Sequence, residues 1–220
     1  MCEYHPVMSP TRPRKDSEHR GPGRPRGSVA ANRDITRDRI YEAATELFAL
    51  RGYHGTSVAQ ISASSGIQTG ALYHHIKSKE ELLWQILRRY TGKALAAAVG
   101  VTSAAADPVD KLSRLIDTHV EVIATHRREV AIQTRDASEL NSEHGIQLQA
   151  LRQGVQDCWE SVIGDCWPDK RSAEVRVLAN GMLGMVNSLW YWFRPERGDT
   201  AAEVAREFRD VIINGVGRTR

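Results

Sequence analysis

Two short helices joined at a glycine are encoded within residues 48–82, and this segment constrains the fold more than any other part of the chain. Ser57 and Gln60 have the S-x-x-Q spacing of a capping box, so a helix is expected to begin after Ser57. Gly66 lacks a Cβ and can adopt the left-handed backbone that ends a helix at little steric cost. The sequence therefore predicts a short helix, a tight turn at Gly66 and a second helix that starts near Gln68.

The second short helix would present small or flat side chains to solvent. Ile67 and Leu72 would face the core, whereas Thr69, Ala71 and His74 would face outward. A helix with such an outer surface fits into the major groove of DNA. The pattern is typical of a helix-turn-helix DNA-binding protein.

This segment resembles the N-terminal domain of the TetR-type (TetR/AcrR) transcriptional repressors. Two positions depart from the family pattern: Ile76 replaces a core phenylalanine, and Gln68 replaces a Ser/Thr helix cap, which can alter base readout. The matching residues are Phe48, Gly52, Tyr53, Thr56, Ser57, Val58, Ile61, Ser62, Ser65, Gly66, Ile67, Gly70, Ala71, Leu72, Tyr73, His75, Ser78, Lys79, Glu80 and Leu82.

The resemblance implies two sets of DNA contacts. Hydroxyl, imidazole and ammonium groups suit phosphate oxygens, and the residues in this set are Thr56, Ser57, Tyr73, His75 and Lys79. The groove-facing set is Gln68, Thr69, Gly70, Ala71 and His74, in which glutamine can pair with adenine and methyl groups can touch thymine. For each residue the alternative is a solvated helix surface, and for Tyr73 it is a half-buried core ring. Adjacent His74 and His75 point to different faces of a helix, so no metal site is expected.

The residues before the helix-turn-helix segment have a different composition. Residues 1–32 are rich in Pro, Gly and Arg and have almost no periodic apolar pattern, so we predict a flexible basic arm. Within it, GPGRPRGS resembles the core of an AT-hook, in which Arg24 and Arg26 would enter a narrow A·T minor groove. A solubilising tail is the alternative.

Composition indicates a soluble, intracellular protein with one large or two small domains, and the resemblance implies the bacterial cytoplasm and nucleoid as its location. The 220 residues have a formal net charge of only +3, so bulk charge does not by itself predict nucleic-acid binding. No apolar run is long enough to cross a membrane, and no signal sequence begins the chain. Cys2, Cys158 and Cys166 lack C-x-x-C spacing, so neither a disulfide framework nor a metal site or cofactor is expected. Cys158 and Cys166 are interpreted as small core residues.

The fold class predicted for the whole chain is all-α. A three-helix DNA-binding domain would occupy residues 33–78, and a helical ligand-binding and dimerisation domain residues 79–220. Apolar residues at helical spacing and capping signals predict helices over residues 36–51, from 79, from 108, and over 128–140, 145–166, 171–193 and from 201.

The last two helices are expected to mediate dimerisation. Between Arg171 and Phe193 the apolar residues cover more than one stripe, which implies burial on two sides, and Gly181 and Gly184 would let another helix approach closely. In the family that this chain resembles, the last two helices of each subunit form a four-helix interface. A homodimer on a roughly palindromic operator is therefore predicted, with a monomer core as the alternative.

The resemblance further implies a small-molecule pocket among the central helices. Polar groups interrupt apolar faces there, with tryptophans nearby in sequence, as an orienting pocket requires. The predicted ligand-binding residues are His119, Arg135, Asp136, Trp159, Asn187 and Trp190. For His119 the alternative is a satisfied core hydrogen bond, and for Arg135, the predicted partner of an anionic group, a surface salt bridge.

Residues 189–205 resemble a region of TetR-type regulators of steroid-ring and fatty-acid breakdown, which respond to acyl-CoA thioesters. The effector would then be a small apolar molecule, with an acyl-CoA thioester as one candidate, and the protein a repressor that the effector releases from DNA. Three alternatives stay open: a regulator of efflux or xenobiotic response, an architectural DNA-binding protein, and an enzyme. Cys158, His119 and Asp136 are the only support for an enzyme, because no nucleophile elbow, phosphate loop or H-E-x-x-H motif is present. We therefore expect no catalytic residue.

Overall fold

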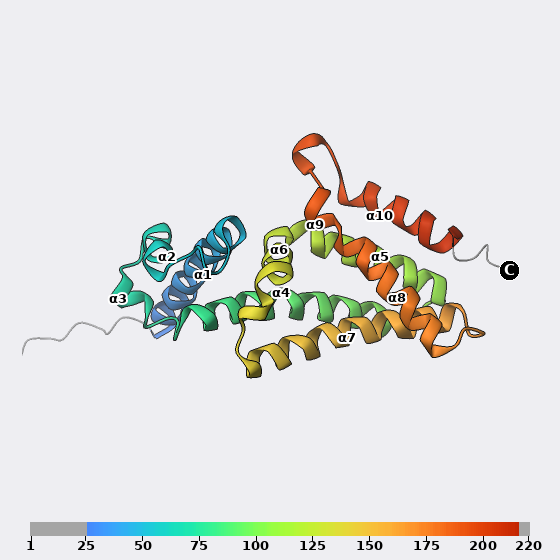
Figure 1. Cartoon of the computed structure of the whole chain (residues 1–220), viewed down its shortest axis with the longest axis horizontal. Helices are drawn as coiled ribbons and strands as arrows, with labels where there is room; N and C mark the ends of the chain where they lie inside the picture. Colours follow the sequence, from blue (N-terminus) through green and yellow to red (C-terminus); the bar gives the residue numbers. More distant parts are fainter. Residues whose placement is uncertain (1–25, 216–220) are drawn as a thin grey trace, which may run out of the picture. The chain divides into compact units, whose positions relative to one another are not determined.

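The computed structural model describes the backbone of residues 26–215 and the side chains of residues 33–215. The chain divides into two compact units, Met1–Ile35 and Thr36–Arg220, and all packing described below lies within the second unit. The structure is all-α, and the residues that it describes contain no β-strand (Figure 1).

The helices follow one another through short connections. In chain order they are α1 (Arg26–Arg51), α2 (Val58–Ser65), α3 (Thr69–Leu72), α4 (Lys79–Thr102), α5 (Pro108–Thr125), α6 (Arg127–Asp136), α7 (Ser142–Cys166), α8 (Ser172–Asn187), α9 (Leu189–Trp192) and α10 (Ala201–Arg209). Two short 3₁₀ turns, Ala137–Glu139 and Pro195–Arg197, and a π-helical turn, Asp210–Asn214, complete the described secondary structure.

The first helix begins earlier than the sequence predicts. It starts at Arg26 instead of near Thr36, so residues 26–32 of the predicted arm have a helical backbone. The prediction placed Arg26 in an extended Arg-Pro unit, and for this residue that backbone conformation is wrong. The apolar period starts only near Ile40, and hydrophobic spacing therefore could not locate the polar first turns of this helix.

The predicted turn between the two short helices is confirmed. The Ser57 hydroxyl accepts from the Gln60 amide at 3.2 Å, and the Gln60 side chain accepts from the Ser57 amide at 2.8 Å. Gly66 ends α2 with a φ of +67°, the left-handed value that favours glycine. Arg39 of α1 donates to the Ser65 carbonyl at 2.6 Å, and a Cβ on Gly66 would lie 3.0 Å from the same guanidinium nitrogen. The turn is therefore fixed by both backbone geometry and a contact from α1.

The caps predicted for the later helices are mostly confirmed. Ser78 caps α4, Asp107 caps α5 with proline in the first turn, and Thr200 caps α10. α7 starts at Ser142 instead of Gly145, because the Asn141 side chain accepts from the His144 amide at 2.9 Å. Each of these helices begins where a short polar side chain satisfies a free backbone amide.

The helix predicted over residues 171–193 is interrupted at Ser188. The Ser188 hydroxyl donates to the carbonyl of Met185 at 2.7 Å, and its oxygen accepts from the indole of Trp192 at 3.0 Å. A serine hydroxyl that bonds to a preceding carbonyl competes with the helical hydrogen-bond pattern. α8 therefore ends at Asn187, and α9 follows as a single separate turn.

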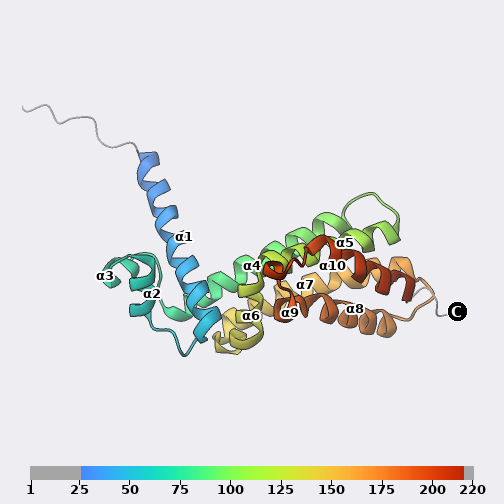
Figure 2. The ribbon, with the colours of Figure 1, turned by 90° about the horizontal axis from the view of Figure 1, so that it is seen from above.

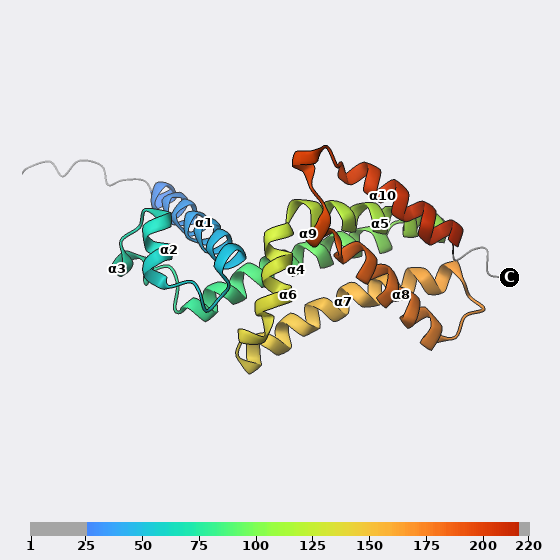
Figure 3. The ribbon, with the colours of Figure 1, turned by 45° about the horizontal axis from the view of Figure 1, so that its top comes forward.

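Two apolar cores organise the second unit. One joins α1–α3 to the start of α4 and includes Phe48, Ile61 and Leu72, each fully buried, with Ile132 of α6 packed among them. The other is built by α4–α10 around the buried ring of Trp159, with Val130 as the contribution of α6. In Figure 2 the α1–α3 group lies at one end of α4, which continues into the second core. α6 lies across α4 between the two cores (Figure 3).

Candidate DNA-binding surface and ligand cavity

The outer face of α3 is exposed, as the sequence predicts. Gln68, Thr69, Gly70 and Ala71 are all exposed, and the Tyr73 ring is 54% exposed, so it is not a core ring. His74 is exposed as well, whereas His75 is half-buried. The structure thus brings the five predicted groove-facing residues, Gln68, Thr69, Gly70, Ala71 and His74, together on one accessible segment.

Hydrogen bonds to α2 fix the position of α3. The Thr69 hydroxyl donates to the Ser62 hydroxyl at 3.0 Å, and Ser62 in turn donates to the carbonyl of Ile67 at 2.5 Å. Leu72 anchors the inner side of α3 and is fully buried. Gln68 occupies the N-cap position but makes no side-chain capping bond, so its amide group is free to contact another molecule.

Thr56 does not offer a phosphate contact, and this prediction is wrong. Its side chain is buried at 1% exposure, and its hydroxyl lies within hydrogen-bonding distance of the carbonyls of Gly52 and Leu47, at 2.9 and 3.2 Å. Its amide donates to the carbonyl of Tyr53. Thr56 therefore braces the loop between α1 and α2, whereas Ser57 beside it is exposed.

Lys79 also has a role inside the fold. Its ammonium donates to the carbonyls of Tyr53 and Thr56, both at 3.0 Å, and lies 4.1 Å from the centre of the Tyr53 ring. These contacts tie the first turn of α4 to the loop before α2. The sequence predicted that Lys79 contacts a DNA phosphate. In the structure, Lys79 also holds the loop between α1 and α2.

The arm contacts predicted from the AT-hook resemblance cannot be placed. Arg24 and the side chain of Arg26 lie outside the described residues.

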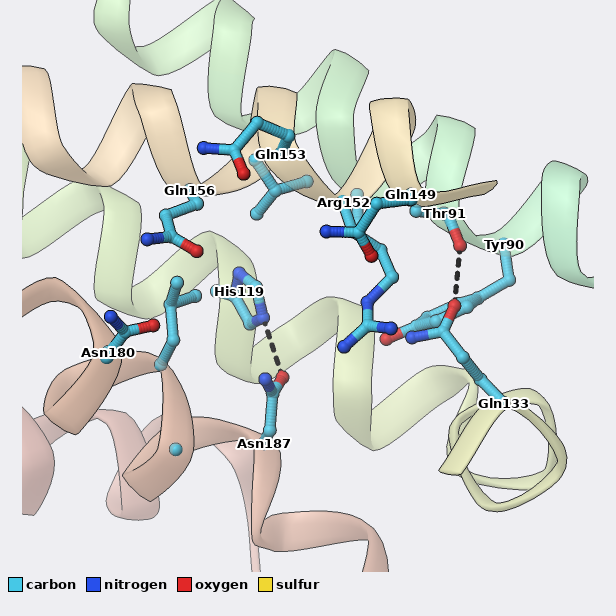
Figure 4. Close-up of a pocket in the computed structure, with 14 residues that line it drawn as sticks. Tyr90, Thr91, His119, Gln133, Gln149, Arg152, Gln153, Gln156, Asn180 and Asn187 are labelled. Carbon is cyan, nitrogen blue, oxygen red and sulfur yellow. Dashed lines mark hydrogen bonds between the residues drawn. The ribbon is translucent and has the colours of Figure 1, made fainter. Parts of the chain in front are cut away.

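A cavity of about 280 Å³ opens between α7 and α8, and side chains from these two helices point toward one another across it (Figure 4). His119 of α5, Gln133 of α6 and Thr91 of α4 lie along its other sides. The lining residues are Tyr90, Thr91, Ala94, His119, Gln133, Gln149, Arg152, Gln153, Val155, Gln156, Asn180, Leu183, Gly184 and Asn187. The lining is more polar than the aromatic pocket that the sequence predicts.

His119 is the buried polar centre of this cavity. Its Nε2 pairs with Oδ1 of Asn187 at 3.1 Å, and its ring stands edge-on to the buried Trp159 at 5.6 Å between ring centres. Burial lowers the pKa of His119, and the hydrogen bond to Asn187 only partly offsets this effect. The imidazole is therefore neutral near pH 7. Trp159 lies behind it, and its indole nitrogen has no hydrogen-bond partner among the described residues.

A polar row on α7 is the part of the cavity that sequence reasoning missed. Gln149, Arg152, Gln153 and Gln156 recur at helical spacing and line one side of the cavity (Figure 4). Arg152 is the only charged residue among the described lining residues, since no aspartate or glutamate occurs there and His119 is neutral. The i, i+3/i+4, i+7 spacing was visible in the sequence, but such a row usually marks a solvated helix face.

Of the predicted ligand-binding residues, Arg135, Asp136, Trp159 and Trp190 lie outside this cavity lining, and each makes contacts within the fold. The Arg135 guanidinium donates to the carbonyls of Phe48 and Ala49 in α1 and pairs with the buried carboxylate of Asp136 at 3.0 Å. Trp190 packs against the second core. In the sequence, Arg135 next to Asp136 looks like an ordinary surface ion pair, so the sequence did not indicate that Arg135 holds the end of α1.

The three residues of the enzyme alternative each have a different partner. His119 pairs with Asn187, Asp136 pairs with Arg135, and the Cys158 thiol lies beside the Thr102 side chain. Burial raises the pKa of the Cys158 thiol, which favours the protonated, weakly nucleophilic form. The structure does not assemble these residues into a catalytic site.

One face of α8 and the chain after it expose apolar groups and glycines. Val177, Tyr191 and Val211 are 69%, 71% and 61% exposed. A Cβ built on Gly181 or Gly184 would meet nothing within 4 Å. Within the described residues, no helix is long and apolar enough to span a bilayer.

Comparison with known proteins covers both parts of the chain. A model described as bacterial regulatory proteins, tetR family, matches residues 40–86, and one described as tetracyclin repressor-like, C-terminal domain, matches residues 105–216. The HTH-type transcriptional repressor KstR2 of Mycobacterium tuberculosis is 26% identical to this chain, and the match spans 86% of this chain and 96% of KstR2.

Solved structures agree with this assignment. The TetR family regulator PfmR from Thermus thermophilus is 30% identical, with a TM-score of 0.73, over 80% of this chain and 97% of its own. AibR, solved with isovaleryl coenzyme A and operator DNA, is 26% identical, with a TM-score of 0.71, over 80% of this chain and 97% of its own. Together with the exposed α3 segment and the second helical core, these matches show that the chain belongs to the TetR family of helix-turn-helix transcriptional regulators.

Proposed function

We propose that this protein is a ligand-responsive transcriptional repressor, acting in the cytoplasm, which binds a palindromic operator as a homodimer and is released by a small-molecule effector. The observation that carries the proposal is the position of α6. Gln133 of this helix lines the cavity, and Arg135, two residues later, holds the carbonyls of α1. A ligand that displaces α6 would therefore also displace the DNA-binding segment.

The proposed domains are an arm over residues 1–32, a DNA-binding domain over residues 33–78 and a ligand-binding and dimerisation domain over residues 79–220. Gln68, Thr69, Gly70, Ala71 and His74 would face the major groove, because their side is exposed and α3 is braced from behind by Ser62 and Leu72. Ser57, Tyr73 and His75 would contact phosphates. Arg24 and Arg26 would add minor-groove contacts.

The proposed dimer interface is formed by α8 and α10. The exposed apolar groups of this region need a partner surface, and the open space at Gly181, which lies outside the cavity lining, would let a second helix approach closely. A two-fold axis there would place two copies of α3 on one side of a dimer, as a palindromic operator requires.

The effector is proposed to be an acyl-CoA thioester or a related carboxylate. AibR was solved with isovaleryl coenzyme A, and KstR2 is also among the relatives of this chain. A regulator of efflux or xenobiotic response would instead bind diverse neutral or cationic compounds, and the Arg152-containing cavity favours an anion.

Footprinting on the DNA that flanks the gene, with and without candidate effectors, tests the proposal. We expect protection of two half-sites about one helical turn or a multiple of it apart, and loss of this protection when the effector is added. Size-exclusion chromatography with light scattering measures the oligomeric state of the free protein. A monomer in both the free and DNA-bound states, or DNA bending that no compound reverses, would contradict the proposal.

A further inference from the structure

The cavity between α7 and α8 has a directional arrangement of hydrogen-bonding groups. Six carboxamides line it, from Gln133, Gln149, Gln153, Gln156, Asn180 and Asn187. A carboxamide both donates and accepts, so a purely hydrocarbon ligand would remove water from these groups without replacing its hydrogen bonds. The lining therefore selects a ligand that carries polar groups of its own.

The charged and unpaired donors lie toward one end of the row on α7. Within the described chain, neither the Arg152 guanidinium nor the Gln149 amide has a hydrogen-bond or ion-pair partner. The Arg152 guanidinium lies close enough to Tyr90 to lower the pKa of its phenol, although burial dominates and raises it. Both side chains are exposed, so an anionic or carbonyl group of a ligand would take the place of water at these donors.

The acceptors lie toward the other end. The amide nitrogens of Gln153 and Gln156 donate to Asp157 and Glu160 at 2.8 and 2.7 Å. Their NH₂ groups are therefore directed to those carboxylates, and their carbonyl oxygens remain to accept from N–H or O–H groups. From Gln149 to Gln156 the helix rises about 10 Å, the length of a short extended chain.

We infer that this cavity holds the anionic, hydrogen-bonding part of the effector, with its negative group at Arg152 and its N–H or O–H groups along Gln153 and Gln156. This inference rests on the proposed function and replaces Arg135 with Arg152 as the anion-binding residue. The amide-bearing arm of a CoA thioester has this chemistry, and so does a small hydroxylated carboxylate. In either case the hydrocarbon part of the effector would lie away from the polar side chains of α7.

Titration calorimetry on the full-length protein tests the inference with four probes: isovaleryl-CoA, coenzyme A alone, a short hydroxy acid and the neutral methyl ester of that acid. We expect an anionic probe to bind and Arg152→Gln to weaken it by about 10-fold or more, with Arg152→Lys between the two. Arg114→Gln is the matched control, because Arg114 is exposed on α5 and lies outside the cavity lining. Thermal melting confirms that each variant is folded.

The probes separate the sources of the ligand, and the outcomes are distinct. Binding by isovaleryl-CoA and coenzyme A assigns a CoA arm, whereas binding by the hydroxy acid alone assigns a small carboxylate. Equal affinity of Arg152→Gln and the unsubstituted protein for every probe overturns the inference, as does preference for the neutral ester or no binding at all. Binding that depends on Arg152 but leaves operator DNA bound would reject the proposed release mechanism and keep the cavity assignment.

Discussion

Arg135 donates a hydrogen bond from Nη2 to the carbonyl of Phe48, which ties α6 to the last turns of α1. A second bond, from Nη1 to the carbonyl of Ala49, measures 3.3 Å. Gly52, at the end of α1, has a φ of +77°, and a Cβ there would lie 3.5 Å from Nε of the same guanidinium. The end of α1 is thus shaped to receive Arg135.

The same short helix also lines the cavity between α7 and α8. Gln133 accepts from the Thr91 hydroxyl of α4 at 2.7 Å, and both residues line the cavity. Ile132, which directly precedes Gln133 in α6, is fully buried in the core that α6 shares with α1–α3. A ligand that competes for Gln133 therefore acts on the element that holds α1.

We expect Arg135→Lys to bind effector with unchanged affinity but to lose most of the coupling between effector and DNA. A lysine retains the charge opposite Asp136 but cannot reach two carbonyls with a planar fork. In the unsubstituted protein, effector should weaken DNA binding by about 5- to 150-fold, and DNA should weaken effector binding by the same factor. DNA-binding titrations with and without effector measure both.

Arg128→Gln is the control for Arg135. Arg128 also joins α6 to α1, through Glu42 at 3.2 Å, but both side chains are exposed, so this ion pair contributes little. The double variant Arg135→Gln/Asp136→Asn removes the clamp without leaving an unpaired buried carboxylate. Full coupling in both Arg135 variants would show that α6 communicates with α1 by another route.

Lys79→Ala should destabilise the protein and weaken binding to every DNA sequence, while the slope of affinity against salt stays unchanged. The loop carbonyls of Tyr53 and Thr56 would lose their ammonium partner, at a cost of about 1–3 kcal/mol in the free energy of unfolding. A phosphate clamp would instead reduce the salt slope by about one unit and leave stability unchanged. Denaturant unfolding and salt-dependent binding distinguish these roles, with the exposed Lys77→Ala as the comparison.

Gln68→Ser should stabilise the protein and relax base preference. The serine hydroxyl can accept from a free amide of the first turn of α3, which Gln68 does not do, and a cap contributes about 0.5–1 kcal/mol. Loss of the glutamine amide removes a pairing with adenine worth about 1–3 kcal/mol of discrimination. Gln68→Ala separates the effects, since it removes the base contact without adding a cap. Unchanged preference in both variants would place Gln68 outside the groove.

His119 should make stability depend on pH on the acidic side of neutrality. Burial lowers the pKa of His119 in the folded protein, whereas in the unfolded chain the group titrates near 6.5. Between the two values the unfolded state binds more protons, so the free energy of unfolding falls as pH decreases below about 6.5. Above that pH the contribution is constant.

The comparison with His119→Gln isolates this group from the other histidines. The glutamine can still pair with Asn187 but does not titrate. From pH 6.5 to 5 the unsubstituted protein should lose stability relative to the variant by at most about 1.4 kcal/mol per pH unit. Parallel stability curves for the two proteins over this range would show that His119 titrates at its ordinary pKa.

Removal of residues 1–25 should leave the helical protein folded and lower its operator affinity. This deletion removes Arg24, which is predicted to enter the minor groove, and retains the start of α1 at Arg26. The loss should be greater on operators with A·T-rich flanks, since narrow minor grooves concentrate negative potential. Gel-shift titrations on A·T-rich and G·C-rich flanks measure it, and equal affinities with and without the arm would reduce it to a solubilising tail.

The sequence alone determined the helix-turn-helix segment and most helix boundaries, because these depend on neighbouring residues. Ser57 and Gln60 cap α2, Gly66 ends it, and Ser78, Asp107 and Thr200 start later helices within three residues of their partners. The exposed face of α3 could likewise be predicted from the spacing of apolar and polar residues within that short helix. The start of α1 was missed because its first turns carry no apolar repeat.

Tertiary structure decided which polar residues meet. Three contacts join residues that are far apart in the sequence. Arg135 and Phe48 are 87 positions apart, His119 and Asn187 are 68 positions apart, and Lys79 and Tyr53 are 26 positions apart. The helical period of a sequence shows that a polar side chain lies off the apolar face of its helix. It does not show which other helix packs against that side chain. A guanidinium is satisfied equally by a ligand anion, a carboxylate or a backbone carbonyl. The packing of α6 against α1 therefore made Arg135 a clamp, and the packing of α7 opposite α8 placed Arg152 at the cavity.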